Sequence, residues 1–454
     1  MTATVDAGAR LDRLPIAPIH RRIMWLIGIG MFVDGFDIYL AGNVLGGLLS
    51  SGFSTLRQNA QFVSLTFAGM VVGALGTGYL SDRFGRRFSY RFNLAFFGLA
   101  SIAAAFAPSM RVLVAIRFLI GMGLGAETVV GYGALAEFAP PAVRGRWLGT
   151  MTLFVVTALP VASLVGSFVI PSIGWRPMFV IAGLGALVVW YLRRQLPESP
   201  RWLESAGHLD DAERVLQGIE RDVARTHTLP PVPVRTAPRT RGVRPVLFSA
   251  EMAPRLALGA VTMIVTNTLL FGFVTWLPTF FVSEGLTIAR SFGFTLLISF
   301  GAPLGAGIGA LTADSWGRKL TIIGASLLTI VLGALYPFVH DSIWLPIAGF
   351  ALVVPIYVLV AVLIGIYVSE LFPTAIRMRG SGICNTFGRA ATIVTPFIVV
   401  ALFSRRGVGG VLAFIIALLL VQIVVVAVIG VEPKRRSLED LAPDAAPGVA
   451  PVHA

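Results

Sequence analysis

Residues 78–87, GYLSDRFGRR, return later in the chain as residues 309–319, GALTADSWGRK. A second stretch, AEFAPPAVRG (136–145), returns as SELFPTAIRM (369–378). Matching positions lie 232 residues apart in the first motif and 233 apart in the second. Two unrelated motifs that repeat at almost one offset indicate that the chain consists of two similar halves.

The composition indicates a membrane protein. Of the 454 residues, 56% are hydrophobic and only 13% are charged, whereas about a quarter of a soluble domain is charged. This excludes a disordered chain, a coiled coil and an ordinary cytosolic enzyme. Because a membrane helix takes about 20 residues, twelve spans would use about 240 residues, close to the hydrophobic share.

Twelve apolar runs follow, six on each side of one polar stretch. They lie at roughly 22–48, 58–80, 88–106, 111–137, 146–170, 174–193, 254–281, 290–312, 319–338, 343–370, 380–403 and 410–430. They are about twice the length of β-barrel strands and do not alternate. We predict an all-α membrane protein in which twelve transmembrane helices form two pseudo-symmetric six-helix bundles.

The expected parts are an N-terminal tail (1–21), a first bundle (22–193), a connector (194–253), a second bundle (254–430) and a C-terminal tail (431–454). The connector should begin with one amphipathic helix over 197–216 and continue as a Pro- and Arg-rich linker over 226–245. The last residues, 441–454, should be disordered.

Lysine and arginine indicate the orientation. Of the 36 such residues, 28 fall on the side of both termini. The outer loops hold Arg57, Arg111, Arg176, Arg290, Arg405 and Arg406, and Arg117 and Arg389 fall inside spans. By the positive-inside rule, both termini face the cytoplasm. The N-terminus lacks the features of a cleaved signal peptide.

Several kinds of chemistry are not expected. The single cysteine, Cys384, excludes a disulfide framework, and no metal-ligand spacing or phosphate-binding loop occurs. We expect no cofactor, no metal and no enzymatic activity, since no nucleophile–base pair stands out. The positive charges are spread between apolar runs, so nucleic acid is not an expected partner.

The sequence resembles the major facilitator superfamily of transporters. GYLSDRFGRR resembles the G-x-x-x-D-R-x-G-R-R signature of that superfamily, and 309–319 is a degenerate copy. RFLIGMGLGAE (117–127), PESPRWL (197–203) and EPKRRSLED (432–440) resemble the sugar-porter branch and its organic-ion relatives. DGFD (34–37) and TWLPTFF (275–281) are similar to aromatic-acid and metabolite:proton symporters. The Q-Q-x-S-G pattern of sugar binding is absent, since VTNTLLFGF (265–273) stands in its place.

The resemblance implies secondary transport by alternating access, with the substrate site between the halves near the midplane. It also implies a monomer in a bacterial inner membrane, with the lipid bilayer, protons and a small-molecule substrate as partners.

Five charges fall inside apolar spans: Asp34, Asp37, Arg117, Glu127 and Arg389. Such charges usually face a partner or a water-filled pathway. We expect Arg117 to pair with Asp37, and protonation of Asp37 to release Arg117; the resemblance implies the same roles. Asp34 and Glu127 complete the proton-coupling candidates. Alternatively, the Asp37–Arg117 pair is static and only fixes the register of the two helices. Asp34 could instead accept hydrogen bonds from neighbouring backbone groups, and Glu127 could contact the substrate.

Arg389 suits recognition of a carboxylate, because a guanidinium can bind it through two hydrogen bonds. In the organic-ion carriers that the sequence resembles, Arg at this position accompanies anionic substrates. Arg389 could instead satisfy carbonyl groups. The other candidate substrate-binding residues are polar or aromatic positions on apolar spans, each of which could be a helix–helix contact instead: Tyr39, Asn43, Asn267, Trp276 and Asn385.

The repeated motifs form a candidate cytoplasmic gate of ion pairs and tight turns. Its residues are Asp82, Arg83, Gly85, Arg86, Glu137, Arg144, Asp314, Gly317, Arg318, Glu370 and Arg377. Surface pairs are individually weak, about 0–1 kcal/mol, but several together could bias two states. The alternative is that these arginines only set the topology.

We therefore expect proton-coupled symport of a small organic acid, such as an aromatic carboxylate. The alternatives are a porter for sugars or neutral metabolites, an exporter of drugs or metabolites, and a receptor that does not translocate its ligand.

Overall fold

The computed structural model describes residues 5–232, 248–250, 252–339, 341, 343–372 and 376–432. Residues 233–245 of the expected linker and the expected disordered tail (441–454) lie outside the described residues.

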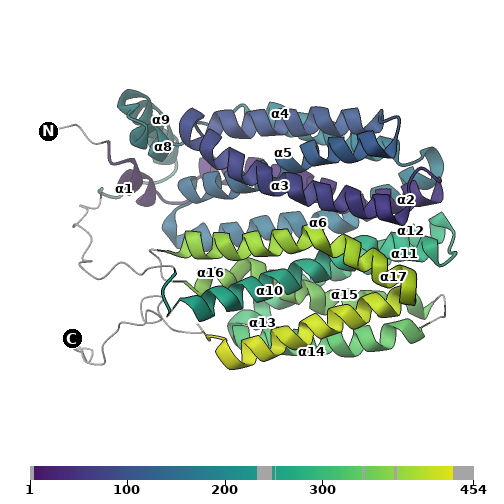
Figure 1. The fold of residues 1–454 in the computed structure, drawn as a ribbon. Helices are drawn as coiled ribbons and strands as arrows, with labels where there is room; N and C mark the ends of the chain where they lie inside the picture. The colour runs from purple at the N-terminus through teal and green to yellow at the C-terminus, as the bar shows by residue number, and fades with distance from the viewer. Residues whose placement is uncertain are drawn as a thin grey trace.

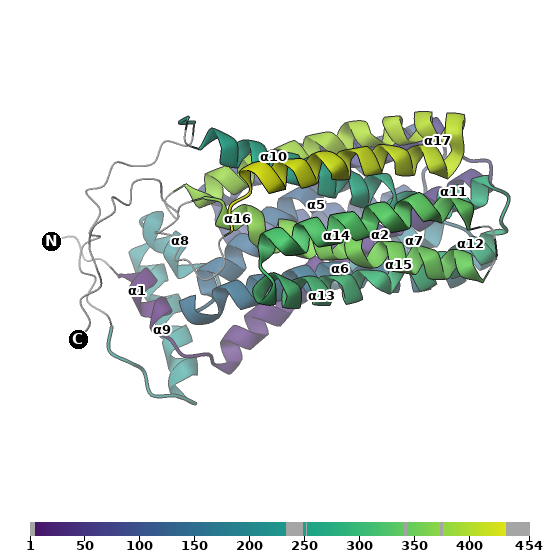
Figure 2. The same cartoon turned by 90° about the horizontal axis from the view of Figure 1, so that it is seen from below.

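The first half contains six long helices joined by short turns. They are α2 (Pro18–Ser50), α3 (Leu56–Phe84), α4 (Arg86–Ala105), α5 (Met110–Phe138), α6 (Pro141–Ile173) and α7 (Arg176–Arg193). Figures 1 and 2 show these helices running side by side along one axis.

The second half repeats this arrangement with more interrupted helices. Its elements are α10 (Ala253–Gly272), η1 (Val274–Trp276), α11 (Leu277–Ser283), α12 (Ile288–Ser299), α13 (Gly301–Ser315), α14 (Arg318–Leu335), η2 (Tyr336–Phe338), α15 (Trp344–Val362), η3 (Leu363–Tyr367), α16 (Val368–Glu370) and α17 (Arg377–Ile429). Pairs such as α10–α11 and α12–α13 each make one span.

The prediction of twelve spans is confirmed. Ten helical stretches of the described chain are long and apolar enough to cross a membrane. One of them, α17, has 53 residues and folds back at Gly407, whose φ of 62° breaks the helix, so it supplies two spans (Figure 1). The twelfth is α4, whose 20 residues include Arg91 and Asn93, which lower its hydropathy.

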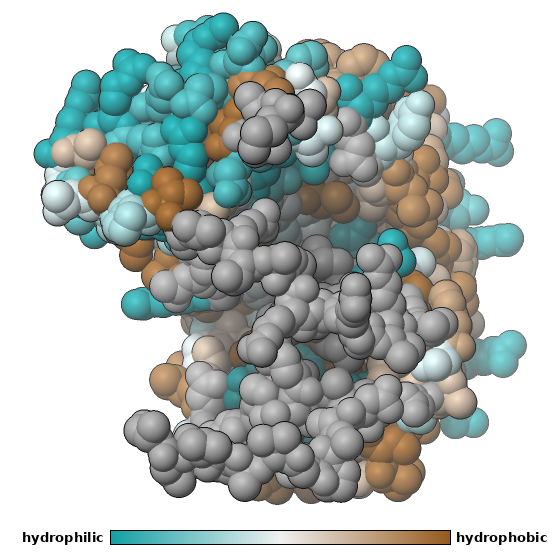
Figure 3. All heavy atoms as spheres, turned by 90° about the vertical axis from the view of Figure 1, so that its left-hand side faces the viewer, coloured by the Kyte–Doolittle hydropathy of each residue, from teal (hydrophilic) through white to brown (hydrophobic). Residues whose placement is uncertain are grey.

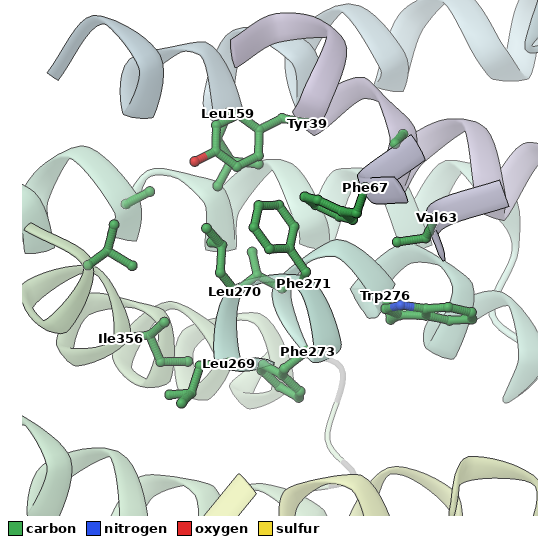
Figure 4. Close-up of a cluster of buried hydrophobic side chains, with 14 of the residues drawn as sticks. Tyr39, Val63, Phe67, Leu159, Leu269, Leu270, Phe271, Phe273, Trp276 and Ile356 are labelled. Carbon is green, nitrogen blue, oxygen red and sulfur yellow. The ribbon is translucent and has the colours of Figure 1, made fainter. Parts of the chain in front are cut away.

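The halves meet along three seams. α3 packs against α17, α6 against α12 and α13, and α2 against η1 and α11. Figure 4 shows apolar side chains from both halves meeting at this interface. Phe67 of α3 and Phe271 of α10 lie edge to face, with ring centroids 4.4 Å apart. Buried aromatic contacts of this kind stabilise the closed packing of the halves.

One end of the bundle carries three short helices, α1 (Ala7–Asp12), α8 (Pro200–Ser205) and α9 (Leu209–Ala224) (Figure 1). Hydrophilic residues dominate this part of the end face in Figure 3. The connector thus begins with two helices and not the single one predicted, because Gly207 adopts a φ of 84° between them. The N-terminal segment folds against them: Arg10 forms ion pairs with Glu213 and Glu220.

Candidate functional site

A buried ion pair joins α2 to α5. Arg117 Nη1 donates to Asp37 Oδ2 over 2.8 Å, and the two side chains are 1% and 0% exposed. Arg117 Nε also donates to Thr66 Oγ1 (3.3 Å), and its guanidinium lies 4.7 Å from the Phe62 ring centroid. Asp37 Oδ1 has no hydrogen-bond partner among the residues that the structure describes. The pairing that the sequence predicted is therefore present, and one carboxylate oxygen remains available.

A small cavity of about 20 Å³ adjoins this pair at the interface of the halves. This volume is enough for about one water molecule. Three polar side chains face it, Thr66, Arg117 and Thr275, and the rest of its lining is apolar: Ile38, Ala41, Val63, Phe67, Met70 and Phe271. Water that enters this cavity would lie beside the guanidinium of Arg117.

A second buried ion pair lies nearer the end that carries α8 and α9. Glu127 of α5 accepts a hydrogen bond from Arg193, the last residue of α7. Arg193 also donates to the carbonyl oxygens of Leu26 and Ile27 (3.0 Å each). Its side chain is 1% exposed, so Arg193 is a buried charge that the sequence analysis did not identify.

Asp34 lies within electrostatic reach of this pair. It is 2% exposed, and neither of its carboxyl oxygens has a hydrogen-bond partner in the described part of the chain. The charged groups that act on it are Glu127, Arg193 and Asp37. The alternative prediction that Asp34 bonds neighbouring backbone is therefore wrong.

The predicted substrate residues do not line the cavity. Asn43 Nδ2 donates to the carbonyl oxygen of Ala162 (3.2 Å), while its Oδ1 is unpaired in the described chain. Asn267 and Asn385 donate to carbonyl groups one turn earlier in their own helices. The bond of Asn43 therefore joins α2 to α6, whereas those of Asn267 and Asn385 stay within their own helices.

The aromatic candidates lie in two different surroundings. Trp276 is fully buried and stacks on Phe280, and its indole N–H has no acceptor among the described residues. Tyr39 is buried in the hydrophobic core that the two halves share (Figure 4), and the hydroxyl group of Tyr357 on α15 has no hydrogen-bond partner in the described chain.

Arg389 lies on α17 in the second half and is only partly exposed. No described carboxylate forms an ion pair with it, which distinguishes it from Arg117 and Arg193. A cation without a counter-ion in an apolar helix can bind an anionic ligand.

The gate motifs form matching ion pairs in the two halves. Arg86 Nε contacts Glu137 Oε1 at 3.1 Å, and Arg318 Nε contacts Glu370 Oε2 at 3.0 Å. Each of these two pairs lies within one half, and the role of the motifs as a cytoplasmic gate stays a prediction. Arg83 is exposed and donates to Tyr79.

Gly85 and Gly317 adopt φ values of 94° and 98°, as tight turns require. Each also makes room for a glutamate: a Cβ would lie 2.4 Å from Glu198 Oε2 and 2.9 Å from Glu432 Oε2, respectively. The side chains of four other gate residues lie outside the described part of the structure: Asp82, Arg144, Asp314 and Arg377.

The sequence analysis missed Glu198 and Glu432 as site residues. Glu198 accepts hydrogen bonds from the backbone N–H groups of Arg86 and Arg87, at the start of α4. Glu432 accepts the equivalent bonds from Arg318 and Lys319, at the start of α14. Acids at helix N-termini stabilise the helix dipole. Burial raises the pKa of Glu198, and the backbone N–H groups oppose this rise. Glu198 and Glu432 lie 234 residues apart, which is close to the 232- and 233-residue offsets of the repeated motifs. This spacing was a signal that could have identified them.

Comparison with known proteins identifies the family. Residues 24–445 match the model of the family described as "Sugar (and other) transporter". The chain is 35% identical over 443 residues to the inner membrane metabolite transport protein YdjE of Escherichia coli (strain K12), covering 96% of this chain and 98% of that protein. It is 29% identical to the niacin transporter NiaP of Acinetobacter baylyi (strain ATCC 33305 / BD413 / ADP1), covering 96% and 100%.

A solved structure of similar fold is the inward open conformation of the xylose transporter XylE from E. coli, with a TM-score of 0.70, 18% identity and coverage of 93% of this chain and 99% of that one. The two repeated halves of the fold and the matches to known transporters point to the same family. The chain belongs to the sugar (and other) transporter family of the major facilitator superfamily, and it is a multi-pass membrane transporter of small-molecule metabolites and not an enzyme.

Proposed function

We propose that this protein is a proton-coupled symporter of a small organic acid that works by alternating access. The observation that carries the proposal is the buried Asp37–Arg117 pair beside a cavity between the two halves. A proton bound to Asp37 removes the charge that holds Arg117, so protonation loosens the contact between α2 and α5. Because α2 also packs on η1 and α11 of the second half, this change can reach the interface.

The proposed substrate carries a carboxylate. Arg389 provides a positive charge without a carboxylate partner among the described residues, and the niacin transporter is a relative whose named substrate is an aromatic carboxylic acid. A guanidinium binds a carboxylate through two parallel hydrogen bonds, which a sugar hydroxyl cannot reproduce. The site is proposed to include Arg389, Tyr39 and Asn43, with Asn267, Trp276 and Asn385 as further candidates.

We also propose that the end with α8 and α9 faces the cytoplasm of a bacterium. Arg86–Glu137 and Arg318–Glu370 then lie at the inner ends of the two bundles, where they can stabilise one state of the transporter. A monomer is sufficient for this mechanism, because both halves of the site lie in one chain.

Uptake into proteoliposomes tests the proposal. With an acidic outside medium, we expect nicotinate to accumulate inside, while nicotinamide, which has the same ring without the charge, and xylose should not. Dissipating the pH gradient with a protonophore should abolish accumulation. Accumulation of xylose or nicotinamide instead of nicotinate would contradict the proposed substrate class, and the absence of any gradient-driven uptake would contradict the coupling.

A further inference from the structure

Among the side chains of the first half that the structure describes, five charged ones are buried: Asp34, Asp37, Arg117, Glu127 and Arg193. Three are acids and two are bases, so one negative charge is unbalanced when all are ionised. Arg117 is matched by Asp37, and Arg193 is matched by Glu127. The unmatched group is therefore Asp34, whose oxygens both lack a hydrogen-bond partner within the described chain.

Arg193 occupies a site built for a guanidinium. A Cβ on Gly30 would overlap Arg193 Nη2, so the absence of a side chain there lets the guanidinium lie against α2. The carbonyl oxygens of Leu26 and Ile27 fix its position. The cation is thus held in place, and Glu127 and Asp34 are the two acids that it can neutralise.

We propose that Asp34, Glu127 and Arg193 form a second proton-binding site, in which the two carboxyl groups share one proton and Arg193 balances the remaining charge. This inference rests on the proposed proton coupling and adds a second proton-binding site to the one at Asp37. With one proton bound the three groups are neutral together. Without it they carry one negative charge in an apolar bundle, which is costly.

The position of this site defines the direction in which a proton could move along the bundle. Glu127 lies ten residues beyond Arg117 on α5, or about 15 Å along the helix at about 1.5 Å per residue. Asp34 lies three residues from Asp37 on α2, about one helical turn. The carboxyl groups thus continue from the Asp37–Arg117 pair toward the end with α8 and α9. A proton that leaves Asp37 can pass to Asp34 and then to Glu127, each step moving one proton and no electrons.

The surroundings add few other ionisable groups. Asp34 is influenced by Asp37 on its own helix, by Glu127 on α5 and by Arg193 on α7. Arg117 on α5 acts on Asp37. On the side of α6, which packs on α2 near Gly35, the contacts are Val155 and Ala158. Tyr132 on α5 contributes a phenol group whose hydroxyl oxygen lies 3.4 Å from Thr152 Oγ1 on α6. In the described chain the second site thus has one cation and two acids, and the charged groups next to it are Asp37 and its partner Arg117.

Infrared spectroscopy of the purified protein tests this inference independently of transport. A shared proton predicts the carbonyl-stretch band of one protonated carboxyl group near neutral pH. Because Arg193 can balance one remaining acid, both Asp34→Asn and Glu127→Gln should remove this band, each leaving a simple ion pair. Glu213→Gln, on the partly exposed α9 pair, is the matched control and should leave the band unchanged. A band that persists in both variants would overturn the shared site.

Transport provides the second readout. Glu127→Gln should lower gradient-driven accumulation at least tenfold, while substrate exchange at equal pH on both sides stays within about twofold of wild type, because exchange needs no net proton movement. Glu127→Asp should restore part of the accumulation. Wild-type accumulation by Glu127→Gln would overturn the relay, whereas loss of coupling in the wild-type protein itself would overturn the proposed function.

Discussion

Arg117 of α5 and Asp37 of α2 form an ion pair of 2.8 Å in which neither side chain reaches solvent. The pair directly joins two helices of the first bundle that pack on each other, and one of them, α2, also contacts the second half. A buried pair of this kind is strongly destabilising when only one partner is removed, because a charge remains without compensation.

Removal of one partner should therefore cost more than removal of both. We expect Arg117→Gln to lower the free energy of unfolding by about 3–5 kcal/mol, and the double variant Asp37→Asn/Arg117→Gln to be closer to wild type. Denaturant titration in mixed micelles measures both. If the double variant loses the sum of the two single losses, the side chains are not coupled.

Gly30 should be needed for its lack of a side chain. Gly30→Ala places a methyl group in the position of the Arg193 guanidinium, so we expect a loss of about 1–3 kcal/mol in stability and impaired coupling. Gly133→Ala on α5 is the matched control, because a Cβ there meets no atom within 4 Å. Thermal melting of both variants checks this; equal melting temperatures would show that Arg193 is free to move.

Arg389 should determine the preference for anions. A hydrogen bond to a charged group contributes about 1.5–3 kcal/mol, so Arg389→Gln should raise KM for nicotinate by roughly 10- to 150-fold. Arg405→Gln, an exposed arginine of the turn within α17, serves as the control and should leave KM near wild type. An unchanged KM in Arg389→Gln would exclude Arg389 from the substrate site.

Docking of α1 on α9 should weaken in acid. Burial alone would raise the pKa of Glu220, but hydrogen bonds from Arg10 and Arg13 outweigh it and hold the pKa below its ordinary value of 4.5. A hydrogen bond from Arg10 likewise lowers the pKa of Glu213. Since these acids are ionised more easily when docked, their contribution is complete above pH 4.5 and is lost as the pH falls through their lowered pKa values.

Hydrogen–deuterium exchange of residues 7–12, corrected for the intrinsic effect of pH, measures this docking. Protection should decrease between about pH 5 and pH 3, and Glu220→Gln should reduce protection already at neutral pH. Protection that stays constant over this range in the wild-type protein would show that these ion pairs do not hold α1.

The fold was predictable because each span must be apolar along its length, and because the two motifs repeat at nearly the same offset. The Asp37–Arg117 pair was also predictable, since charges within apolar helices need partners. The second pair was not, because Arg193 stands beside Arg194 at a helix end, where an arginine ordinarily marks the cytoplasmic surface. Only its contacts with Gly30 and Glu127, which depend on the packing of three helices, distinguish it.

The residues that line the cavity were the least predictable part of the candidate site. Asn267 and Asn385 satisfy their own helices, whereas Thr66, Phe67 and Phe271 line the cavity. A polar residue on an apolar helix gives no sign of which of these surroundings it will meet. Which faces of α3 and α10 meet depends on how the two halves pack, and helical periodicity alone does not specify this.

Direct measurement of proton movement tests the central claim. In proteoliposomes that contain a pH-sensitive dye, with no pH gradient at the start, adding nicotinate outside should acidify the interior, and Asp37→Asn should reduce this acidification to the level of protein-free liposomes. Nicotinate uptake by the wild-type protein without acidification above that level would contradict a proton-coupled mechanism.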